Sequence, residues 1–257
     1  MITQKKPYRI GLIVPSSNTT METEIPELLR RQSSGKGYTF SFHSSRMRLK
    51  EVTPEALRAM NQQSARCVAE LNDAKVDAIM YACLVAVMIG GKEGMLETDT
   101  YLREASLESG QLPAIISSSS ALVKSIQDLK ASRISLIAPY KKALTRQVIQ
   151  TIEAHDITVV DSHSLEVTDN FQVGQLDPSH LVDIARNMDL SQSDALVISA
   201  CVQMPSLAAI AEVEQMISLP VISAASASVH QLLGQLDLMP DIQSAGRMLS
   251  SHAAMLS

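Results

Sequence analysis

The chain has 257 residues and a formal net charge of −5, with 46% hydrophobic and 19% charged residues. This length allows two domains of ordinary size or one large domain, and the composition is typical of a soluble globular protein. The mild negative charge and the absence of a basic run argue against a nucleic-acid partner. No stretch approaches the roughly 18 consecutive apolar residues of a membrane span, and residues 1–8 lack the apolar core of a signal peptide. We therefore predict a cytoplasmic protein with no membrane partner.

The chain has three cysteines, Cys67, Cys83 and Cys201. Three cysteines do not make a disulfide framework, and they suit a reducing compartment. They form no CxxC pair, and no histidine lies within four positions of any of them. The sequence therefore indicates no metal site at these thiols.

Apolar strands and helices alternate through the first half of the chain. Pro15 ends the first strand because it has no N–H for the strand ladder. Thr53 and Pro54 mark the start of a long helix, with Thr as the N-cap and Pro in the first position. Leu84 to Gly91 is expected to be an apolar loop with a glycine hinge. The expected strands are 9–14, 38–44, 77–83 and 112–117, and the expected helices are 21–34, 53–73, 92–109 and 121–129.

The second half of the chain repeats this order. Ser135-Leu-Ile-Ala-Pro139 matches Gly11-Leu-Ile-Val-Pro15, and the Leu-Pro pair before the fourth strand recurs as well. The expected strands are 133–138, 157–161, 194–201 and 219–223, with helices ending near 155, beginning at 177, and covering 204–217 and 225–236.

Strands that alternate with helices indicate right-handed βαβ units on a parallel sheet. We predict an α/β protein of two pseudo-symmetric Rossmann-like halves. Each half has a mainly parallel four-stranded sheet flanked by helices, and the active site lies in the cleft between them. The N-terminal half is predicted to span residues 1–118 and the C-terminal half residues 119–224. A C-terminal helix within residues 225–257 is expected to pack back on the N-terminal half.

Two of the cysteines end equivalent strands, Asp77–Cys83 and Asp194–Cys201. Ligands of parallel sheets gather at the carboxyl ends of the strands. A single cysteine is often only a packed residue, which is how we interpret Cys67 within its helix. Two cysteines at equivalent strand ends instead favour chemistry, because a thiolate is a nucleophile and a neutral thiol is a proton donor. Such a pair suits addition to one carbon with protonation of its neighbour, or proton transfer from one face of a carbon to the other.

Polar side chains at the other strand ends suggest a receptor for carboxylates. Asn18, Tyr140 and Asn170 each follow a strand, and Ser117–Ser120 precede a helix. Amides, hydroxyls and helix N-termini bind anions without a lysine. For Asn18 the alternative is helix capping, because the same residue types are preferred as caps. Ser117–Ser120 are interpreted as caps.

The layout of two halves and two cysteines resembles the aspartate/glutamate racemase superfamily. More narrowly, it is similar to the maleate cis-trans isomerases over essentially the whole chain. The segments that carry this resemblance are Val14–Pro26, Tyr81–Val85, Ala138–Tyr140 and Ser199–Pro205. Amino-acid racemases of the superfamily typically have Cys-Asn-Thr where this chain has Cys83-Leu84-Val85, which disfavours racemisation.

The resemblance implies that Cys83 is the nucleophile and Cys201 the acid/base partner. It also implies that Asn18, Tyr140 and Asn170 hold the substrate carboxylates, and the apolar residues after the two cysteines are expected to contact the substrate. These apolar residues are Leu84, Val85 and Val202. The family works without a cofactor or metal and forms dimers or tetramers, so we expect a homodimer or homotetramer. The apolar faces of helices 53–73 and 225–236 point to the same expectation.

The predicted reaction is the conversion of maleate to fumarate. The Cys83 thiolate adds to the double bond, the C–C bond rotates, and elimination restores the alkene. The alternative within enzymes is a cofactor-independent racemase or decarboxylase of a small carboxylic acid. A protein that only binds small carboxylates is the alternative outside enzymes, but binding alone has no use for a reactive thiol.

Overall fold

The computed structural model describes residues 6–251, and the first part of the chain forms a parallel sheet. The strand order is β2-β1-β3-β4, and all neighbouring pairs are parallel. β1 lies in the middle because its residues from Ile10 onward are buried, as a central parallel strand requires. The strands of this sheet are β1 (Lys6–Pro15), β2 (Tyr38–Met47), β3 (Ala78–Tyr81) and β4 (Ala114–Ser117).

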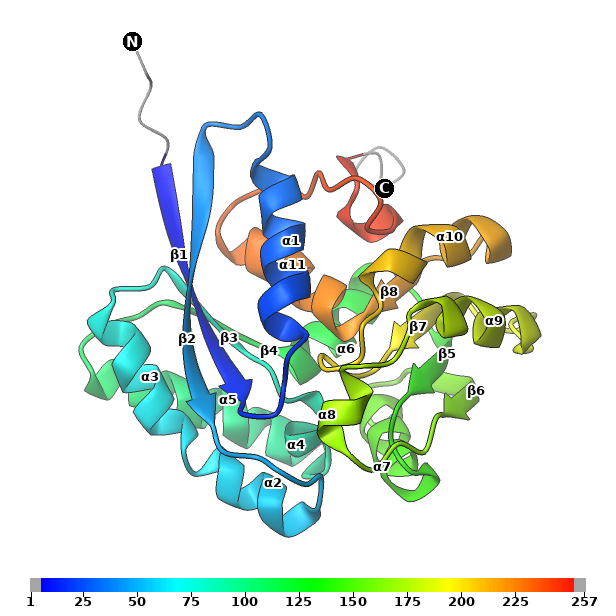
Figure 1. The fold of residues 1–257 in the computed structure, drawn as a ribbon, viewed down its shortest axis with the longest axis horizontal. Helices are drawn as coiled ribbons and strands as arrows, with labels where there is room; N and C mark the ends of the chain where they lie inside the picture. The colour runs from blue at the N-terminus through cyan, green and yellow to red at the C-terminus, as the bar shows by residue number, and fades with distance from the viewer. Residues whose placement is uncertain (1–5, 252–257) are drawn as a thin grey trace.

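A second parallel sheet repeats this order in the later part of the chain. Its strand order is β6-β5-β7-β8, which is the first order with every strand replaced by its equivalent. Figure 1 shows the two sheets side by side, the first running from blue (β1) to green (β4) and the second from green (β5) to orange (β8). The predicted fold class of two matching α/β halves is confirmed. The strands are β5 (Arg133–Ala138), β6 (Thr158–Ser164), β7 (Ala195–Ser199) and β8 (Val221–Ser223).

Helices connect the strands in both halves. In the first they are α1 (Met21–Ser33), α2 (Pro54–Asn61), α3 (Ser64–Asp73), α4 (Leu84–Met88), α5 (Gly91–Glu108) and α6 (Ser118–Asp128). In the second they are α7 (Lys142–Glu153), α8 (Asn170–Val173), α9 (Ser179–Asn187), α10 (Leu207–Ile217), α11 (Ala224–Gln235) and the 3₁₀ turn η1 (Arg247–Leu249).

Three segments differ from their predicted structure, and the third, α8 in the expected loop around Asn170, is described with the site below. The single helix expected over 53–73 is broken into α2 and α3, and the Gln63 side chain at the break accepts a hydrogen bond from the Arg48 N–H at 3.0 Å. At the break the Gln63 N–H bonds to the Met60 carbonyl oxygen at 2.9 Å, an i−3 contact of the 3₁₀ type in place of the i−4 bond of an α-helix. The expected loop after Cys83 is instead the helix α4, whose five residues are all buried. A fully buried apolar segment forms a helix because its backbone groups must be paired.

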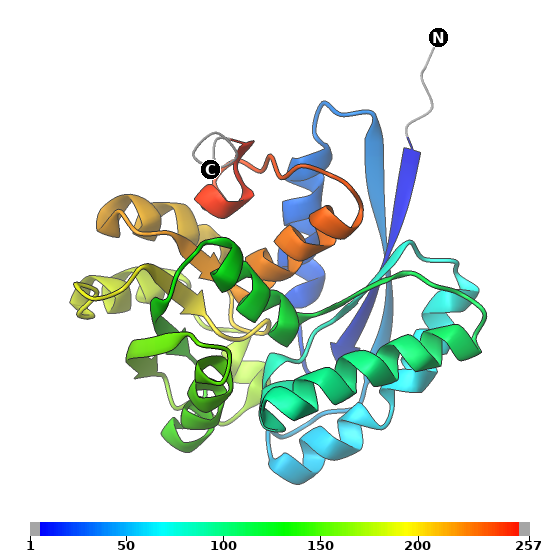
Figure 2. The ribbon, with the colours of Figure 1, turned by 180° about the vertical axis from the view of Figure 1, so that it is seen from behind.

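The helix α11 lies between the two halves, as Figure 2 shows from behind. It packs on α1, β3 and β4 of the first half, on α6, and on β8 of its own half. Eight of its residues are buried, so its apolar face is covered within the chain rather than left over for a partner. α11 ends at Gln235, and turns and η1 follow it. Residues 252–257, the end of the segment predicted from sequence, lie outside the described residues.

The division at residues 118 and 224 stays a prediction. In the part of the chain that the structure describes, no helix is both long enough and apolar enough to cross a lipid bilayer.

Candidate active site

A small cavity of about 20 Å³ lies where the carboxyl ends of the two sheets meet. All eight residues predicted from sequence for catalysis or binding line this cavity: Cys83, Leu84, Val85, Asn18, Tyr140, Asn170, Cys201 and Val202. Sequence reasoning missed its other lining residues, which are Pro15, Leu49, Val52, Ala82 and Gln203. Leu49 and Val52 have apolar side chains, so no sequence signal separates them from ordinary core residues. Gln203 is a polar residue two positions after Cys201, and that position is a signal for a site residue.

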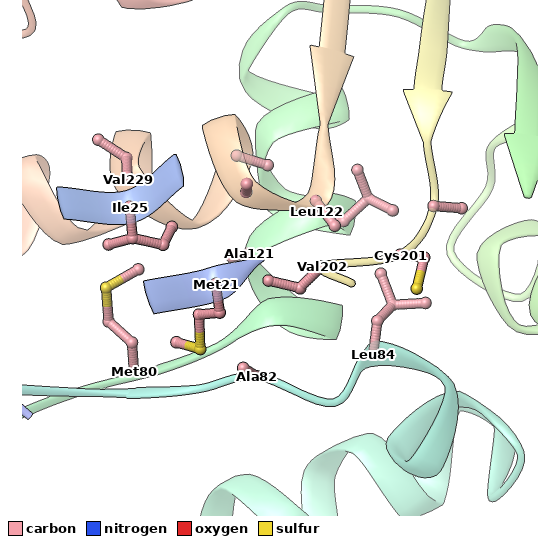
Figure 3. Packing of buried hydrophobic residues seen from close by; sticks show 14 of the residues in the cluster. Met21, Ile25, Met80, Ala82, Leu84, Ala121, Leu122, Cys201, Val202 and Val229 are labelled. Atoms are coloured by element: carbon pink, nitrogen blue, oxygen red, sulfur yellow. The ribbon is translucent and has the colours of Figure 1, made fainter. Parts of the chain in front are cut away.

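Buried side chains of both halves meet around this cavity. Figure 3 shows Leu84, from the N-terminal half, close to Cys201 and Val202 of the C-terminal half. Cys83 and Cys201 are each 7% exposed. The cavity wall is therefore mainly apolar, and the two thiols are reached from the same small space.

The Cys83 thiol lies at the N-terminal end of α4. Burial raises its pKa to about 12, although the Ala86 N–H of the first turn of α4 stabilises the thiolate and opposes that rise. The nearby Cys201 raises the pKa further, because two thiolates would repel each other. Cys83 is therefore a neutral thiol in this buried position.

The Cys201 thiolate is stabilised by more neighbouring groups than the Cys83 thiolate is. Burial again raises its pKa, but the Tyr140 hydroxyl and the backbone N–H groups of Gln203 and Met204 oppose the rise. The same hydroxyl donates to the Ala200 carbonyl oxygen at 3.2 Å. Tyr140 is itself buried, and burial raises its pKa well above the ordinary value, so it remains a hydrogen-bond donor.

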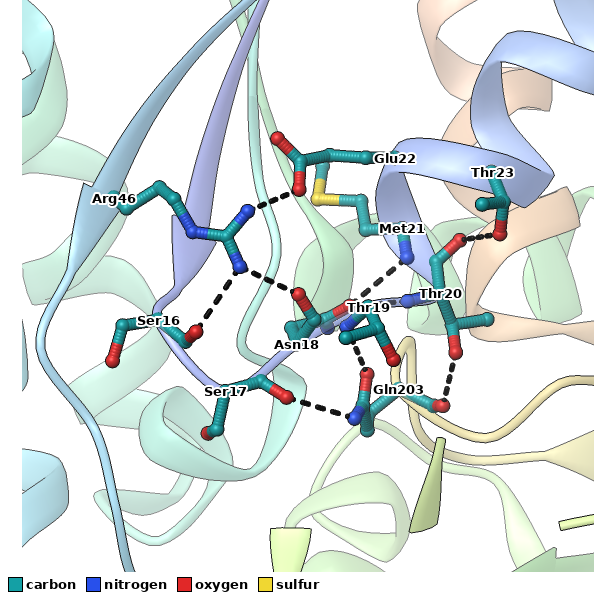
Figure 4. Close-up of polar contacts among 10 residues, drawn as sticks. All are labelled: Ser16, Ser17, Asn18, Thr19, Thr20, Met21, Glu22, Thr23, Arg46 and Gln203. Carbon is teal, nitrogen blue, oxygen red and sulfur yellow. Dashed lines mark hydrogen bonds and ion pairs between the residues drawn. The ribbon is translucent and has the colours of Figure 1, made fainter. Parts of the chain in front are cut away.

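Asn18 caps a helix and also lines the cavity. Its Oδ1 accepts hydrogen bonds from the Thr20 and Met21 N–H groups, both at 2.9 Å, at the start of α1. Arg46 donates to its backbone carbonyl at 2.7 Å (Figure 4). Because capping occupies only Oδ1, the Nδ2 group remains a donor for the cavity. The two interpretations of Asn18 are thus compatible.

Asn170 is the first residue of α8, in a segment where a loop was expected. Asp169 caps this short helix by accepting from the Phe171 N–H at 2.9 Å. The Asn170 Nδ2 donates to Ser17 Oγ at 2.7 Å, so its amide already reaches across to the segment that carries Asn18. The two asparagines therefore come from opposite halves and line one cavity.

The serines before α6 do not take part in this site. Ser117 Oγ pairs with Ser119 Oγ at 2.7 Å, and Ser120 donates to Asp99 at 2.7 Å. The Ser117 side chain makes no capping bond, so the expectation that it caps α6 is wrong. Cys67 is fully buried in α3 and does not line the cavity, in agreement with a packing role.

A larger cavity of about 750 Å³ shares Val52, Tyr140 and Asn170 with the small one. Glu51 and Asp169 on its wall form an isolated antiparallel bridge, which links the segment after β2 to the segment before α8. No cysteine lines this larger cavity. We therefore assign the reaction to the small cavity despite the difference in volume.

No lysine, arginine or histidine lines the small cavity. Anion binding there therefore depends on amides, a hydroxyl and backbone N–H groups. Within residues 6–251, no three His, Cys, Asp or Glu side chains are grouped so that they could hold a metal ion. The predicted independence of metal and cofactor stays a prediction.

Comparisons with known proteins show the family of the chain. A family model described as arylmalonate decarboxylase matches residues 10–249. The maleate isomerase of Geobacillus stearothermophilus is 49% identical over 246 residues, which is 95% of this chain and 98% of that protein. The chain belongs to the arylmalonate decarboxylase family and, within it, to the maleate isomerases.

Two solved maleate isomerase structures are similar over their whole length. The enzyme from Pseudomonas putida S16, solved as a cysteine-to-alanine variant with maleate, has a TM-score of 0.93 and 45% identity, covering 95% of this chain and 98% of that one. The Nocardia farcinica enzyme, a cysteine-to-serine variant with a covalently bound succinylcysteine intermediate, has a TM-score of 0.91 and 45% identity with the same coverage. The prediction of an isomerase is confirmed.

Proposed function

We propose that this maleate isomerase converts maleate to fumarate by reversible addition of the Cys83 thiolate to the double bond. One observation carries the proposal: two thiols from equivalent strand ends line a single cavity together with two amides and a hydroxyl. The succinylcysteine in the Nocardia farcinica relative supports a covalent adduct of this kind.

In the proposed reaction, the Cys83 sulfur forms a bond to one alkene carbon, and the π electrons move to the neighbouring carbon. The Cys201 thiol gives its proton to that carbon, so the adduct is a succinyl thioether and Cys201 becomes a thiolate. The C–C bond is now single, and rotation separates the two carboxylates. Cys201 then removes the proton, the double bond forms again, and the Cys83 thiolate leaves. Covalent catalysis replaces rotation about a π bond with two easier steps.

Asn18, Tyr140 and Asn170 are proposed to hold the carboxylates. The Nδ2 groups of the asparagines supply donors from opposite halves, and the Tyr140 hydroxyl also stabilises the Cys201 thiolate. Leu84, Val85 and Val202 exclude water from the reacting carbons. In such an apolar site hydrogen bonds to charge are stronger than in water.

The cavity of about 20 Å³ has room for little more than one water, which needs about 10–15 Å³. A four-carbon diacid needs more, so we propose that the site opens to admit the substrate and then closes around it. Burial is the main cause of the raised Cys83 pKa. We therefore propose that Cys83 loses its proton while the open site is hydrated, before closure.

The test is incubation of the protein with maleate and observation of the vinyl protons of fumarate by NMR. Fumarate formation that needs no added metal or cofactor is the expected result. Activity on a malonate or an amino acid without fumarate formation would contradict the proposal and favour a decarboxylase or a racemase.

We further propose a cytoplasmic homodimer or homotetramer. The helix α5 exposes large apolar side chains, with Leu96 71% and Tyr101 44% exposed, and these suit a contact between copies. Light scattering at micromolar concentration should give a multiple of the 27.9 kDa chain mass. A monomer mass would contradict the proposal.

A further inference from the structure

The side chain of Gln203 joins segments from the two halves of the molecule. Its Oε1 accepts a hydrogen bond from the Thr19 N–H at 2.9 Å, and its Nε2 donates to the carbonyl oxygens of Ser17 at 3.0 Å and Asn170 at 2.8 Å. Figure 4 shows the two contacts on the Ser17–Thr19 side. Gln203 is only 2% exposed, so water cannot easily replace these bonds.

The partners of Gln203 are the residues that determine where the two cavity asparagines lie. Ser17 and Thr19 flank Asn18, so its backbone is held on both sides. Asn170 is held through its own carbonyl, and its side chain donates to Ser17 Oγ at 2.7 Å. A single buried amide therefore relates the position of Asn18 to that of Asn170.

Gly174, which follows α8, shows how closely this amide is packed. A Cβ atom there would lie 2.6 Å from Gln203 Nε2 and 2.6 Å from Thr19 Oγ1. Its φ of −72° is one that any residue adopts, so the backbone does not require glycine. The missing side chain instead leaves the space that Gln203 and Thr19 fill.

Only an amide satisfies these three partners. A carboxylate at position 203 would place acceptor oxygens against two carbonyl oxygens, and an apolar side chain would leave two acceptors and one donor unpaired. The chemistry of the contacts thus explains why glutamine stands at this position.

We propose that Gln203 is a positioning residue for the isomerase reaction. Its side chain sets the spacing of Asn18 and Asn170, and hence the fit of the site to two carboxylates at once. This inference rests on the proposed function. A displacement of about 1 Å in such a site is enough to cost about 100-fold in rate.

The test compares Gln203→Met with the matched control Gln32→Met. Gln32 is also buried and makes three hydrogen bonds, to Tyr38, Met239 and Asp241, far along the chain from both cysteines. Both variants should unfold at lower urea concentration than the wild type. Only Gln203→Met should lose about 100-fold in kcat/KM for maleate.

Combination with Asn18→Ala distinguishes positioning from stability. If Gln203 positions Asn18, then Asn18→Ala should reduce kcat/KM for maleate less in the Gln203→Met background than in the wild type, because Asn18 is already misplaced there. In the Gln32→Met background Asn18→Ala should reduce kcat/KM as much as in the wild type. Equal losses in all backgrounds, or wild-type kcat/KM in folded Gln203→Met, would overturn the inference. If Gln203→Met does not fold, Gly174→Ala replaces it, because its Cβ displaces the same amide. Absence of fumarate from the wild type would instead refute the proposed function itself.

Discussion

The Glu24 carboxylate accepts a hydrogen bond from the Leu207 N–H at 2.7 Å, and this contact joins α1 of the first half to the first turn of α10 in the second. The same oxygen accepts from the Ser206 N–H at 2.6 Å. Burial raises the pKa of Glu24, and these hydrogen bonds only partly offset the rise. The two halves are thus tied together by a buried acid at a helix N-terminus, five residues after Cys201.

This contact predicts a pH-dependent stability that depends on Glu24. The pKa of Glu24 is higher in the folded than in the unfolded protein. Its contribution to the free energy of unfolding is therefore complete below its ordinary pKa of 4.5 and is lost as pH rises through the folded pKa. Glu24→Gln keeps an oxygen for both N–H groups and does not ionise. The free energy of unfolding in urea should therefore increase for Glu24→Gln relative to the wild type as pH rises from 4.5 to neutrality.

Glu24→Ala is the companion variant. It leaves the Ser206 and Leu207 N–H groups without their acceptor, which should cost about 1–3 kcal/mol at every pH. A constant difference between wild type and Glu24→Gln across this pH range would show that Glu24 does not titrate as described.

Asn18→Asp separates the capping and binding roles of Asn18. Aspartate keeps an acceptor for the Thr20 and Met21 N–H groups, so the cap is retained. Position 18 is only 2% exposed, so burial of the new carboxylate offsets the gain from its charge at the helix N-terminus. The donor for a carboxylate is lost, and a hydrogen bond to a charged group contributes about 1.5–3 kcal/mol, or about 10- to 150-fold in kcat/KM.

Asn18→Ala should lose both properties, with about 1 kcal/mol of stability removed along with the cap. Kinetics with maleate and thermal unfolding of the two variants make the comparison. Full activity in folded Asn18→Asp would mean that Asn18 is only a cap.

The raised thiol pKa values predict an activity that increases with pH. Burial raises the pKa of Cys83 to about 12 and also raises that of Cys201. The fraction of ionised Cys83 therefore increases as pH rises above neutrality. The measured kcat/KM should rise between pH 7 and 9, with Cys67→Ala giving the same profile. A decline over this range would contradict the assigned roles.

The two cysteines should fail in different ways when replaced. Cys83→Ala should abolish isomerisation because the thiol that remains in the cavity, Cys201, is assigned to proton transfer rather than to addition. Cys201→Ala should be severely impaired because the variant lacks the group that gives the proton to the adduct carbon and later removes it. An adduct that takes this proton from solvent should persist, because no thiol remains to remove it again. Intact mass of that variant with maleate should show one added C4 diacid, mapped to the peptide that contains Cys83.

Cys67→Ala is the control for this pair, and it should lose only packing energy because Cys67 is buried in α3. An adduct on Cys201 would reverse the two roles. Full activity of Cys83→Ala would refute the covalent mechanism.

The sequence alone determined the architecture and the identity of the principal site residues. Its apolar runs repeat in the same order in both halves, and parallel strands bring their carboxyl ends to one edge. Cys83 and Cys201, at matching ends, could thus be assigned to one site, and Asn18, Tyr140 and Asn170 joined them through position and resemblance. The strand order is confirmed because it follows from local apolar patterns, and the structure places these five residues around one cavity. Their roles in catalysis and binding stay predictions.

Only the tertiary structure decided how those residues are held. Gln203 lies more than 180 positions from Ser17 and Thr19 in the sequence, and Glu24 is about as far from Ser206 and Leu207. No local sequence pattern predicts contacts over such separations. The raised pKa of Cys83 likewise comes from burial that requires both halves to be present. The sequence also could not show that Asn18 both caps a helix and lines the cavity, because asparagine suits either role. Only the directions of its Oδ1 and Nδ2 atoms in the structure separate the two roles.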